Sequence, residues 1–420
     1  MNRYSLAALL LLSAAPLALA QQLRFTPFHP GGIYDPGEPA GWTVTPPADA
    51  APGADAWRYV IRRNNRDTIN SGTLDFSHGS ATIEATLDEP AMLYVEVTST
   101  EGGTPIHLGA AIAPARLKPS VPCPADFDSF WDGKLKALAQ VPMNPVLTPG
   151  PSPAPGVEFY TVQLDSLGSH VQGYLARPAK EGKFPALVIY QYAGVYPLQP
   201  KTVTDRAAEG WLAFDVDSHD MPPAQAAGVA PNYPAIGNTS RETSYFLNMY
   251  LRDTRAIDYI RSRPDWDGRT IVLTGTSMGG QQSLAAAGLN PQVTAVIVNE
   301  PSGADTNGDL HGRKAGYPNW PSGNPEVMET ALYFDPVNFA SRIRAPVLAA
   351  IGFIDTTSPP AGVWTAMNQI PGPWEVVSMV ESDHNNRTPE KQGEYVARAR
   401  EVLATILNGG VFKPRSPVAR

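Results

Sequence analysis

A serine framed by glycines stands between a strand-like and a helix-like stretch of this chain. In VLTGTSMGGQQSLAAAG (residues 272–288), Gly275, Ser277 and Gly279 form the pattern G-x-S-x-G. This pattern places a serine on a sharp strand-to-helix turn, where the helix N-terminus favours developing negative charge. The pentapeptide is short enough to occur by chance. The strand-like residues before it and the helix-like residues after it favour Ser277 as a nucleophile over a polar residue of a Gly-rich turn.

A serine hydroxyl needs a base, and only two histidines, His311 and His384, follow Ser277 in the sequence. Folds that use this turn order their residues as serine, carboxylate and histidine along the chain. His384 comes just after the last predicted strand, whereas His311 lies in an irregular stretch. His384 is therefore the predicted base. A surface or substrate-contacting role is predicted for His311.

Two aspartates are candidates for the carboxylate that orients the base. Asp355, in LAAIGFIDTTSPP, follows the strand that precedes the His384 strand, so the two residues are expected to meet at the carboxyl edge of one sheet. Asp383 adjoins His384, and neighbouring side chains point apart along an extended chain. Asp355 is therefore the predicted acid. Its alternative role is to cap a turn before Thr356.

Acyl transfer also needs two backbone donors for the oxyanion. The amide of Met278, directly after the nucleophile, is the first predicted donor. The second is predicted in YQYAGVYPLQ, where Gly194 and Val195 permit close backbone approach. Tyr196, in the same stretch, is a candidate for substrate binding, although aromatic residues at strand ends more often serve packing.

An acidic cluster in FDVDSHDMPP offers an alternative chemistry. Asp215, Asp217, His219 and Asp220 are residue types that hold a metal able to activate water. Four such groups crowded on one strand-to-loop segment cannot all converge on one ion. We therefore predict a loop that shapes the catalytic mouth, and we expect no metal and no cofactor.

The elements that must position these residues alternate from about residue 157 to 408. Continuous apolar runs such as FPALVIYQY and TIVLTG predict strands covered on both faces, and helical stretches separate them. The prediction is an α/β domain with a mostly parallel sheet. Residues 301–345 are too irregular for a compact connection and are predicted to fold over one end of the sheet. Tyr317 and Trp320, together with His311, are predicted to offer sugar rings a surface there.

Three segments precede this alternation. Residues 1–20 have a basic start, a short apolar stretch and a small-residue end, which predicts a cleaved secretory signal and export to the periplasm or the extracellular space. Residues 21–118 show period-two alternation between turns, which favours an immunoglobulin-like β-sandwich. Residues 119–420 form the predicted catalytic domain, opening with a helix near 127–138 that is expected to pack on its sheet.

Composition limits the partners. The formal net charge of −8 provides no basic face for nucleic acid or anionic lipid. Cys123 is the single cysteine, so an intrachain disulfide is impossible, and the thiol of an exported protein is expected to be buried. After residue 20, no apolar run approaches the roughly 20 residues that span a bilayer.

The catalytic domain resembles the acetyl xylan esterase and cephalosporin C deacetylase family, carbohydrate esterase family seven of the α/β-hydrolases. The resemblance covers roughly residues 119–408. Its motifs are PADFDSFW, GTSMGGQQSLAAAG, YFDPVNFASRIRAPVLAAIGFIDTTSPP and SDHNN. It implies Ser277 as nucleophile, Asp355 as acid and His384 as base, the same three residues that the chain order predicts.

The chain departs from this family at two positions. Met278 stands where the family usually has glutamine, and Val195 stands where it usually has tyrosine, so the amides of Gly194 and Val195 are both candidates for the second oxyanion donor. The added N-terminal domain leaves open whether the chain forms the family's ring-like homo-oligomer.

The resemblance implies an esterase that removes acetyl groups from plant cell-wall polysaccharide or oligosaccharide, xylan first. The alternatives are an esterase for acetylated pectin or another hemicellulose, a glucuronoyl esterase, a prolyl-type peptidase, and a non-catalytic carbohydrate-binding protein. A glucuronoyl esterase would be expected to have arginine where this chain has Met278. Peptidases of this fold usually carry a propeller, and no blade-like repeat is visible.

Overall fold

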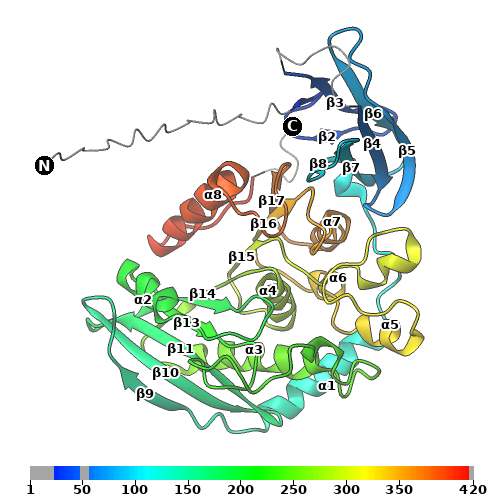
Figure 1. The fold of residues 1–420 in the computed structure, drawn as a ribbon. Coiled ribbons are helices and arrows are strands. Elements are labelled where there is room, and N and C mark those ends of the chain that lie inside the picture. The colour runs from blue at the N-terminus through cyan, green and yellow to red at the C-terminus, as the bar shows by residue number, and fades with distance from the viewer. Residues whose placement is uncertain (1–22, 48–55, 416–420) are drawn as a thin grey trace, which may run out of the picture.

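A computed structural model describes residues 23–47 and 56–415 of the protein. The predicted secretory signal, residues 1–20, lies outside the described residues. A nine-stranded sheet forms the centre of the larger part of the molecule, in the order β17-β16-β15-β14-β12-β13-β11-β10-β9 (Figure 1). Its strands are β9 (Val146–Gly150), β10 (Val157–Ser166), β11 (Ser169–Pro178), β12 (Phe184–Tyr190), β13 (Leu212–Val216), β14 (Trp266–Thr276), β15 (Ala295–Asn299), β16 (Val347–Gly352) and β17 (Trp374–Met379).

This sheet is mostly parallel, as its apolar runs predict. Strands β12 to β17 pair in parallel, whereas β9, β10 and β11 pair antiparallel at one side. The interior strands β13, β15 and β16 are buried at every position. Because helices cover both faces, these strands need no polar face and read as continuous apolar runs.

Helices cover the two faces of the sheet in separate groups. One face packs against α2 (Pro200–Glu209) and α8 (Pro389–Leu407). The other packs against α3 (Tyr245–Ser262), α4 (Met278–Leu289), α6 (Pro336–Ala340) and α7 (Pro360–Asn368) (Figure 1). The α/β architecture predicted for this part of the chain is thus confirmed.

Two smaller sheets form the N-terminal part. One has the order β1-β3-β6 and the other β2-β8-β7-β4-β5. The strands are β1 (Arg24–Pro27), β2 (Ile33–Tyr34), β3 (Pro39–Thr45), β4 (Trp57–Arg63), β5 (Asp67–Thr73), β6 (Ala81–Thr86), β7 (Ala91–Ser99) and β8 (Ile106–Ile112). Both sheets contribute to one core, with Trp42 and Ile83 from the first and Ile61 and Val95 from the second. The immunoglobulin-like topology stays a prediction.

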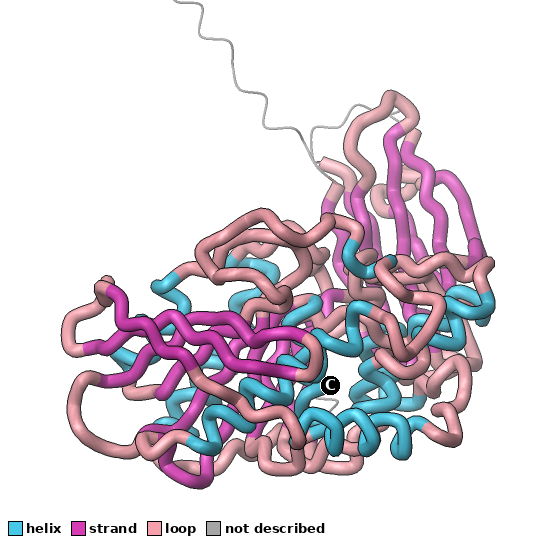
Figure 2. The backbone as a smooth tube through the Cα atoms, turned by 90° about the horizontal axis from the view of Figure 1, so that it is seen from below, coloured by secondary structure: helices cyan, strands magenta, loops and turns pink. Residues whose placement is uncertain are grey.

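The N-terminal part contacts the hydrolase part near the ends of β16 and β17 (Figure 1), and Figure 2 shows its strands projecting from one side of the larger part. Met92, Ala111 and Leu117 share a buried cluster with Phe353 and Trp364. Gly109 of β8 packs so closely that a Cβ there would lie 2.6 Å from the Cβ of Phe353. Because Phe353 precedes Asp355 by two residues, this contact supports the segment that carries the predicted acid.

The chain leaves the N-terminal sheets through η1 (Pro114–Arg116) and a proline-rich joint, then enters α1 (Phe127–Ala139). This helix packs on α3 and on aromatic residues such as Phe339, not on the sheet as expected, because α3 and α4 already cover that face. Cys123 is exposed, so the expected burial of its thiol is wrong. Prolines flank it on both sides, and their fixed φ and missing N–H groups keep this segment out of a helix.

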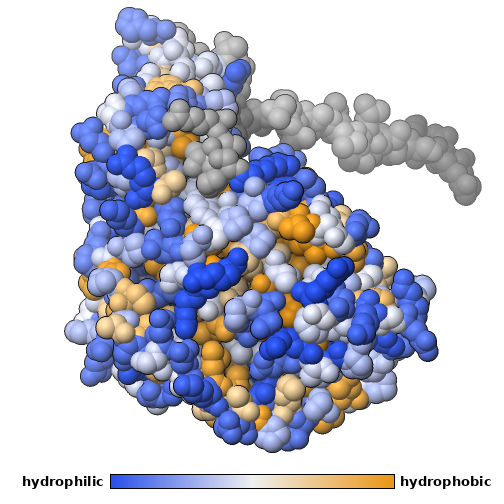
Figure 3. All heavy atoms as spheres, turned by 180° about the vertical axis from the view of Figure 1, so that it is seen from behind, coloured by the Kyte–Doolittle hydropathy of each residue, from blue (hydrophilic) through white to orange (hydrophobic). Residues whose placement is uncertain are grey.

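The irregular stretch after β15 contains three short helices, η3 (Thr306–His311), α5 (Pro325–Ala331) and α6. It packs against the loop that contains η2 (Tyr233–Ala235), since the indole N–H of Trp320 donates to the carbonyl of Pro234 at 2.7 Å. Across the part of the chain described here, helices are too short or too polar to cross a membrane. On the face opposite Figure 1, apolar patches lie scattered among hydrophilic side chains (Figure 3).

Candidate active site

Ser277 occupies the turn between β14 and α4 with φ 57° and ψ −121°. A positive φ is unfavourable for a residue with a side chain, so surrounding contacts must hold this conformation. The Ser277 amide donates to the carbonyl of Asn299 at 2.9 Å, and its carbonyl accepts from the amides of Gln281 and Ser302. The neighbouring strand, the helix and the loop after β15 therefore all anchor the serine.

The two glycines of the motif are required by close backbone packing. A Cβ on Gly275 would lie 2.3 Å from the carbonyl carbon of Gly279, and a Cβ on Gly279 would lie 2.1 Å from the carbonyl oxygen of Tyr190. Real Cβ atoms do not approach backbone this closely. Glycine at positions 275 and 279 therefore allows the turn that carries Ser277 to pack against the end of β12.

Ser277, His384 and Asp355 form one chain of hydrogen bonds. His384 Nε2 lies 2.9 Å from Ser277 Oγ, and His384 Nδ1 lies 2.7 Å from Asp355 Oδ2. An ionised carboxylate only accepts, so Nδ1 carries the proton and Nε2 presents its lone pair to the serine hydroxyl. The structure brings together the three residues that chain order selects.

The acid is held by its own turn. Asp355 Oδ1 accepts from the amides of Thr357 at 2.8 Å and Ser358 at 2.7 Å. Asp355 is fully buried, while Ser277 is 4% and His384 9% exposed. The turn-capping role and the contact with His384 therefore coexist, one on each carboxylate oxygen. Burial strengthens the ionic hydrogen bond between Asp355 and His384.

Asp383, the rival acid, faces away from the base. Its Oδ1 accepts from the amides of Asn385 and Asn386, and its Oδ2 contacts Lys391 at 3.0 Å. Burial alone would raise the pKa of Asp383, but the hydrogen bonds from Asn386 and Lys391 outweigh it and hold this pKa below its usual value. Asp383 stabilises the turn that carries His384.

The predicted oxyanion donors lie on the expected elements. The amide of Met278 is the first of α4, where helix amides lack intrahelical partners. The amide of Gly194, in contrast, donates to the hydroxyl of Tyr233 at 3.3 Å. Since that hydroxyl engages Gly194, the amide of Val195 is the stronger of the two predicted second donors.

His219 fixes the same loop. It is fully buried, and burial lowers the pKa of its imidazole to about 4, so the ring is neutral at pH 7. His219 Nε2 lies 3.0 Å from the Gly194 carbonyl and Nδ1 lies 2.7 Å from the Tyr245 hydroxyl. The ring donates to the carbonyl and accepts from the hydroxyl. The FDVDSHD segment thus supports the loop predicted to supply the second oxyanion donor.

The other acids of that segment separate from one another. Asp215 is buried on β13, Asp217 accepts from the amide of His219, and Asp220 contacts His170. Among the described residues, the group of three or more such side chains whose ligand-type atoms all lie within 4.8 Å of one another consists of Glu300, Asp355 and His384. An ion bound to the facing Asp355 and His384 atoms would need them more than about 3 Å apart, since each bond is about 2.0–2.2 Å long. Their 2.7 Å contact is a hydrogen bond.

Met278 has a defined side-chain environment. Its Sδ accepts from the hydroxyls of Tyr233 at 3.3 Å and Tyr317 at 3.1 Å, and these hydroxyls lie 2.8 Å from each other. Tyr317 therefore brings the irregular stretch to the residue beside the nucleophile. No motif in the sequence indicates Tyr233, because its loop has no regular pattern.

The other two residues predicted to meet sugars in this stretch behave differently. Trp320 is 8% exposed and packs edge-on against Phe246, with ring centroids 5.5 Å apart. This burial does not fit the prediction that Trp320 offers its ring to a sugar; the ring completes an aromatic core. His311 is exposed at the end of η3, and no contact joins it to the triad.

An aromatic pair lies on the loop predicted to supply the second oxyanion donor. Tyr192 is 51% exposed, and its ring stacks on Tyr196 with centroids 4.5 Å apart. The Tyr196 hydroxyl donates to the Tyr192 carbonyl, and Gln191 donates to the Tyr196 carbonyl. Tyr196 thus serves mainly as a support, and Tyr192 presents the free aromatic face beside the site.

Glu300 is a neighbour of the triad that sequence reasoning missed. It directly follows β15 and is fully buried beside Asp355 and His384. The rule that located Asp355, a carboxylate just past the end of a parallel strand, could have found it.

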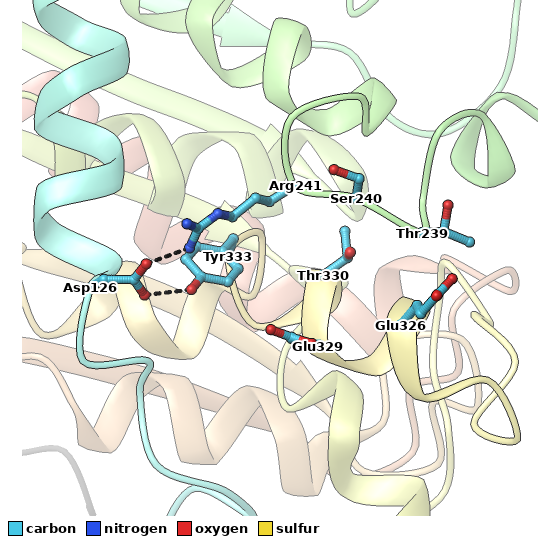
Figure 4. A pocket seen from close by; sticks show the side chains of 8 residues that line it. All are labelled: Asp126, Thr239, Ser240, Arg241, Glu326, Glu329, Thr330 and Tyr333. Atoms are coloured by element: carbon cyan, nitrogen blue, oxygen red, sulfur yellow. Dashed lines mark hydrogen bonds and ion pairs between the residues drawn. The ribbon is translucent and has the colours of Figure 1, made fainter.

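A separate polar hollow of about 460 Å³ shares no lining residue with the triad (Figure 4). It is lined by Asp126, Thr239, Ser240, Arg241, Glu326, Glu329, Thr330 and Tyr333. Arg241 is already paired with Asp126 at 2.6 Å and lies over the ring of Tyr333. These contacts tie α1 to the loop before α3.

Known proteins match most of the length of this chain. The family model "Acetyl xylan esterase (AXE1)" matches residues 115–307 and 318–399. The acetyl esterase Axe7A of Xylanibacter ruminicola is 30% identical over 376 residues, 85% of each chain. The unmatched residues 308–317 between the two family segments fall in the irregular stretch after β15.

Two solved structures are similar to this one. An acetyl xylan esterase from Paenibacillus sp. R4 is 25% identical and matches with a TM-score of 0.62, covering 71% of this chain and 98% of its own. Acetyl xylan esterase 1 from Thermoanaerobacterium sp. JW/SL YS485 shares the fold at 23% identity and a TM-score of 0.58, covering 68% of this chain and 96% of its own. Together with the hydrogen-bonded serine, histidine and aspartate, these matches identify the chain as a member of the acetyl xylan esterase (AXE1) family and a carboxylic ester hydrolase.

Proposed function

We propose that this protein is an exported serine esterase that removes acetyl groups from plant cell-wall carbohydrate, with acetylated xylan as the first substrate. The observation that carries the mechanism is the continuous contact from Asp355 through His384 to Ser277 Oγ. The names of the matched relatives support the acetyl ester, and residues 1–20 support export.

In the first half-reaction, Ser277 Oγ attacks the acetyl carbonyl while His384 Nε2 takes the hydroxyl proton. Asp355 holds the imidazole in the required tautomer and stabilises its protonated form. The Met278 amide and a second amide of the 194–195 loop stabilise the oxyanion. The protonated His384 then gives its proton to the leaving sugar oxygen, and an acetyl-enzyme remains.

In the second half-reaction, His384 takes a proton from water, which attacks the acetyl-enzyme and releases acetate. The Ser277 oxygen regains its proton from His384, so the enzyme returns to its starting state. Tyr192, exposed on the predicted oxyanion loop, is placed to stack against a sugar ring of the substrate.

The experiment is acetate release from acetylated xylan, pectin, mannan and xyloglucan by the wild type and by Ser277→Ala. The variant is expected to lose activity by at least about 10⁴-fold, because the nucleophile is removed. Ser283→Ala is the matched control, since Ser283 lies buried in the same helix and bonds only the Gly279 carbonyl. Full acetyl-ester hydrolysis by Ser277→Ala would overturn the mechanism, and preference for another polysaccharide would overturn xylan as first substrate.

A further inference from the structure

Glu300 is built into the catalytic centre by contacts from three separate segments. Its Oε1 accepts from the Ser382 hydroxyl at 3.0 Å and from Gln392 Nε2 at 3.1 Å. Its amide donates to the carbonyl of Ala350 on β16, and its backbone has a positive φ of 45°. This backbone conformation is unfavourable for a residue with a side chain and persists only where surrounding contacts hold it.

The chain also leaves space for this carboxylate. A Cβ on Gly352, at the end of β16, would lie 2.9 Å from Glu300 Oε1 and 2.7 Å from the Ser382 carbonyl oxygen. Gly352 therefore admits both Glu300 and the loop that carries His384. A residue with a larger side chain at Gly352 would push the carboxylate away from the triad.

The Glu300 carboxylate lies beside the acid and the base. Glu300 Oε2 is buried and makes no hydrogen bond within the described residues. Glu300, Asp355 and His384 have facing atoms within 4.8 Å of one another, and Arg387 Nε lies 3.7 Å from Oε2. Across that distance inside a protein, a carboxylate interacts strongly with an imidazolium.

We propose that Glu300 is a second carboxylate of the catalytic centre, a positioning residue that anchors the His384 loop through Ser382 and adds negative charge that stabilises protonated His384. This role rests on the proposed esterase mechanism, because His384 gains a proton in each half-reaction. No hydrogen bond joins Glu300 to Ser277 among the described residues. Glu300 acts through His384.

The groups that face Glu300 decide its own ionisation. They are Asp355 and His384 of the triad, Arg387 of the His384 loop, and Tyr395 of α8. Burial, and then the charge of Asp355, raise the pKa of Glu300 to about 7, while His384 and Arg387 act in the opposite direction. A negative charge on Glu300 and a proton on His384 therefore stabilise each other.

The test is Glu300→Gln, measured with a small acetyl ester such as p-nitrophenyl acetate across pH 5–9. The amide keeps an oxygen that can accept from Ser382 and Gln392, so the variant removes charge and keeps shape. In the plot of kcat/KM against pH, the plateau is expected to fall by about tenfold, because protonated His384 loses the negative charge that stabilises it. The acid limb of the pH profile is expected to move to lower pH, because protonated His384 loses the stabilisation that the negative charge of Glu300 provides.

Asp335→Asn is the matched control. Asp335 is also buried with a pKa raised to about 7, mainly by burial, but it bonds the amides of Asp305, Thr306 and Val337 away from the triad. The acid limb of the pH profile of Asp335→Asn should stay where it is in the wild type, even if the variant is less stable. If Glu300→Gln lowers the plateau but leaves the limb in place, or leaves both unchanged, the proposal is wrong.

The pH dependence of Ser277 labelling by a fluorophosphonate gives an independent readout. It reports the base function of His384 whether or not acetyl esters are hydrolysed. A wild type that labels but does not cleave acetyl esters would overturn the proposed substrate and leave the Glu300 test intact. If the labelling of wild type and of Glu300→Gln falls over the same range of acidic pH, the proposed role of Glu300 is wrong.

Discussion

At the scale of single residues, two aspartates near His384 do different work although both are chemically suited to be the acid. Asp355 reaches His384 Nδ1 from a different strand end, whereas Asp383 bonds its own turn and Lys391. Distance along the chain does not predict contact, because adjacent side chains diverge while neighbouring strands of a sheet bring their ends together.

Asp355→Asn is expected to lower kcat by about 10³–10⁴-fold, because an amide no longer holds the base in the tautomer that accepts the serine proton. Steady-state hydrolysis of an acetyl ester measures this. Asp383→Asn is its control and should stay within about tenfold of wild type, losing mainly stability. Equal losses in the two variants would contradict the assignment of Asp355.

Tyr192→Ala is expected to lower kcat/KM for acetylated xylo-oligosaccharides by roughly tenfold, because a pyranose presents a flat apolar face that stacks on an exposed ring. Hydrolysis of p-nitrophenyl acetate, which has no sugar, should change little. Tyr192→Phe keeps the aromatic face and should retain activity on both substrates. A loss of equal size on both substrates in the alanine variant would count against a sugar contact.

At the scale of elements, the strand–turn–helix unit β14–α4 requires glycine at positions where a side chain would clash with neighbouring backbone. Gly279 lies against the Tyr190 carbonyl at the end of β12, on the same side as the loop predicted to supply the second oxyanion donor. The nucleophile and this loop are therefore positioned by one close backbone contact.

Gly279→Ala is expected to lower the free energy of unfolding by more than about 3 kcal/mol, because backbone cannot move away from a Cβ at 2.1 Å without shifting β12. Urea unfolding followed by tryptophan fluorescence measures this. Gly133→Ala is the comparison, since Gly133 is exposed on α1 with open space around it. That change should raise stability by about 0.5–1 kcal/mol. Similar effects at the two positions would show that helix propensity, not packing, dominates.

At the scale of the whole molecule, the N-terminal sheets and the hydrolase part share a buried cluster around Phe353. Phe353→Ala is expected to lower the free energy of unfolding by about 3–5 kcal/mol through the cavity it leaves. The same change should reduce kcat, because Phe353 also fixes the segment before Asp355. Val146→Ala, an exposed position on the far edge strand β9, should change neither. Unchanged thermal unfolding of Phe353→Ala would contradict a supporting role for the contact.

Much of the fold was predictable because it follows from local patterns. Strands buried on both faces need continuous apolar runs, and the chain order of Ser277, Asp355 and His384 follows from the succession of strands β14, β16 and β17. The irregular stretch after β15 was predictable only as irregular. The inward burial of Trp320 depends on Phe246, a residue far away in sequence.

The sequence by itself thus determined the hydrolase architecture, the family and three residues that meet in the site, since each rests on periodicity or on a motif with a steric cause. Tertiary structure alone decided that Cys123 is exposed, that Tyr192 and not Tyr196 presents the free aromatic face, and that Glu300 joins the triad. These depend on distances between segments that are remote in sequence. The packing of helices on the sheet fixes such distances, and the spacing of apolar residues along the sequence does not predict them.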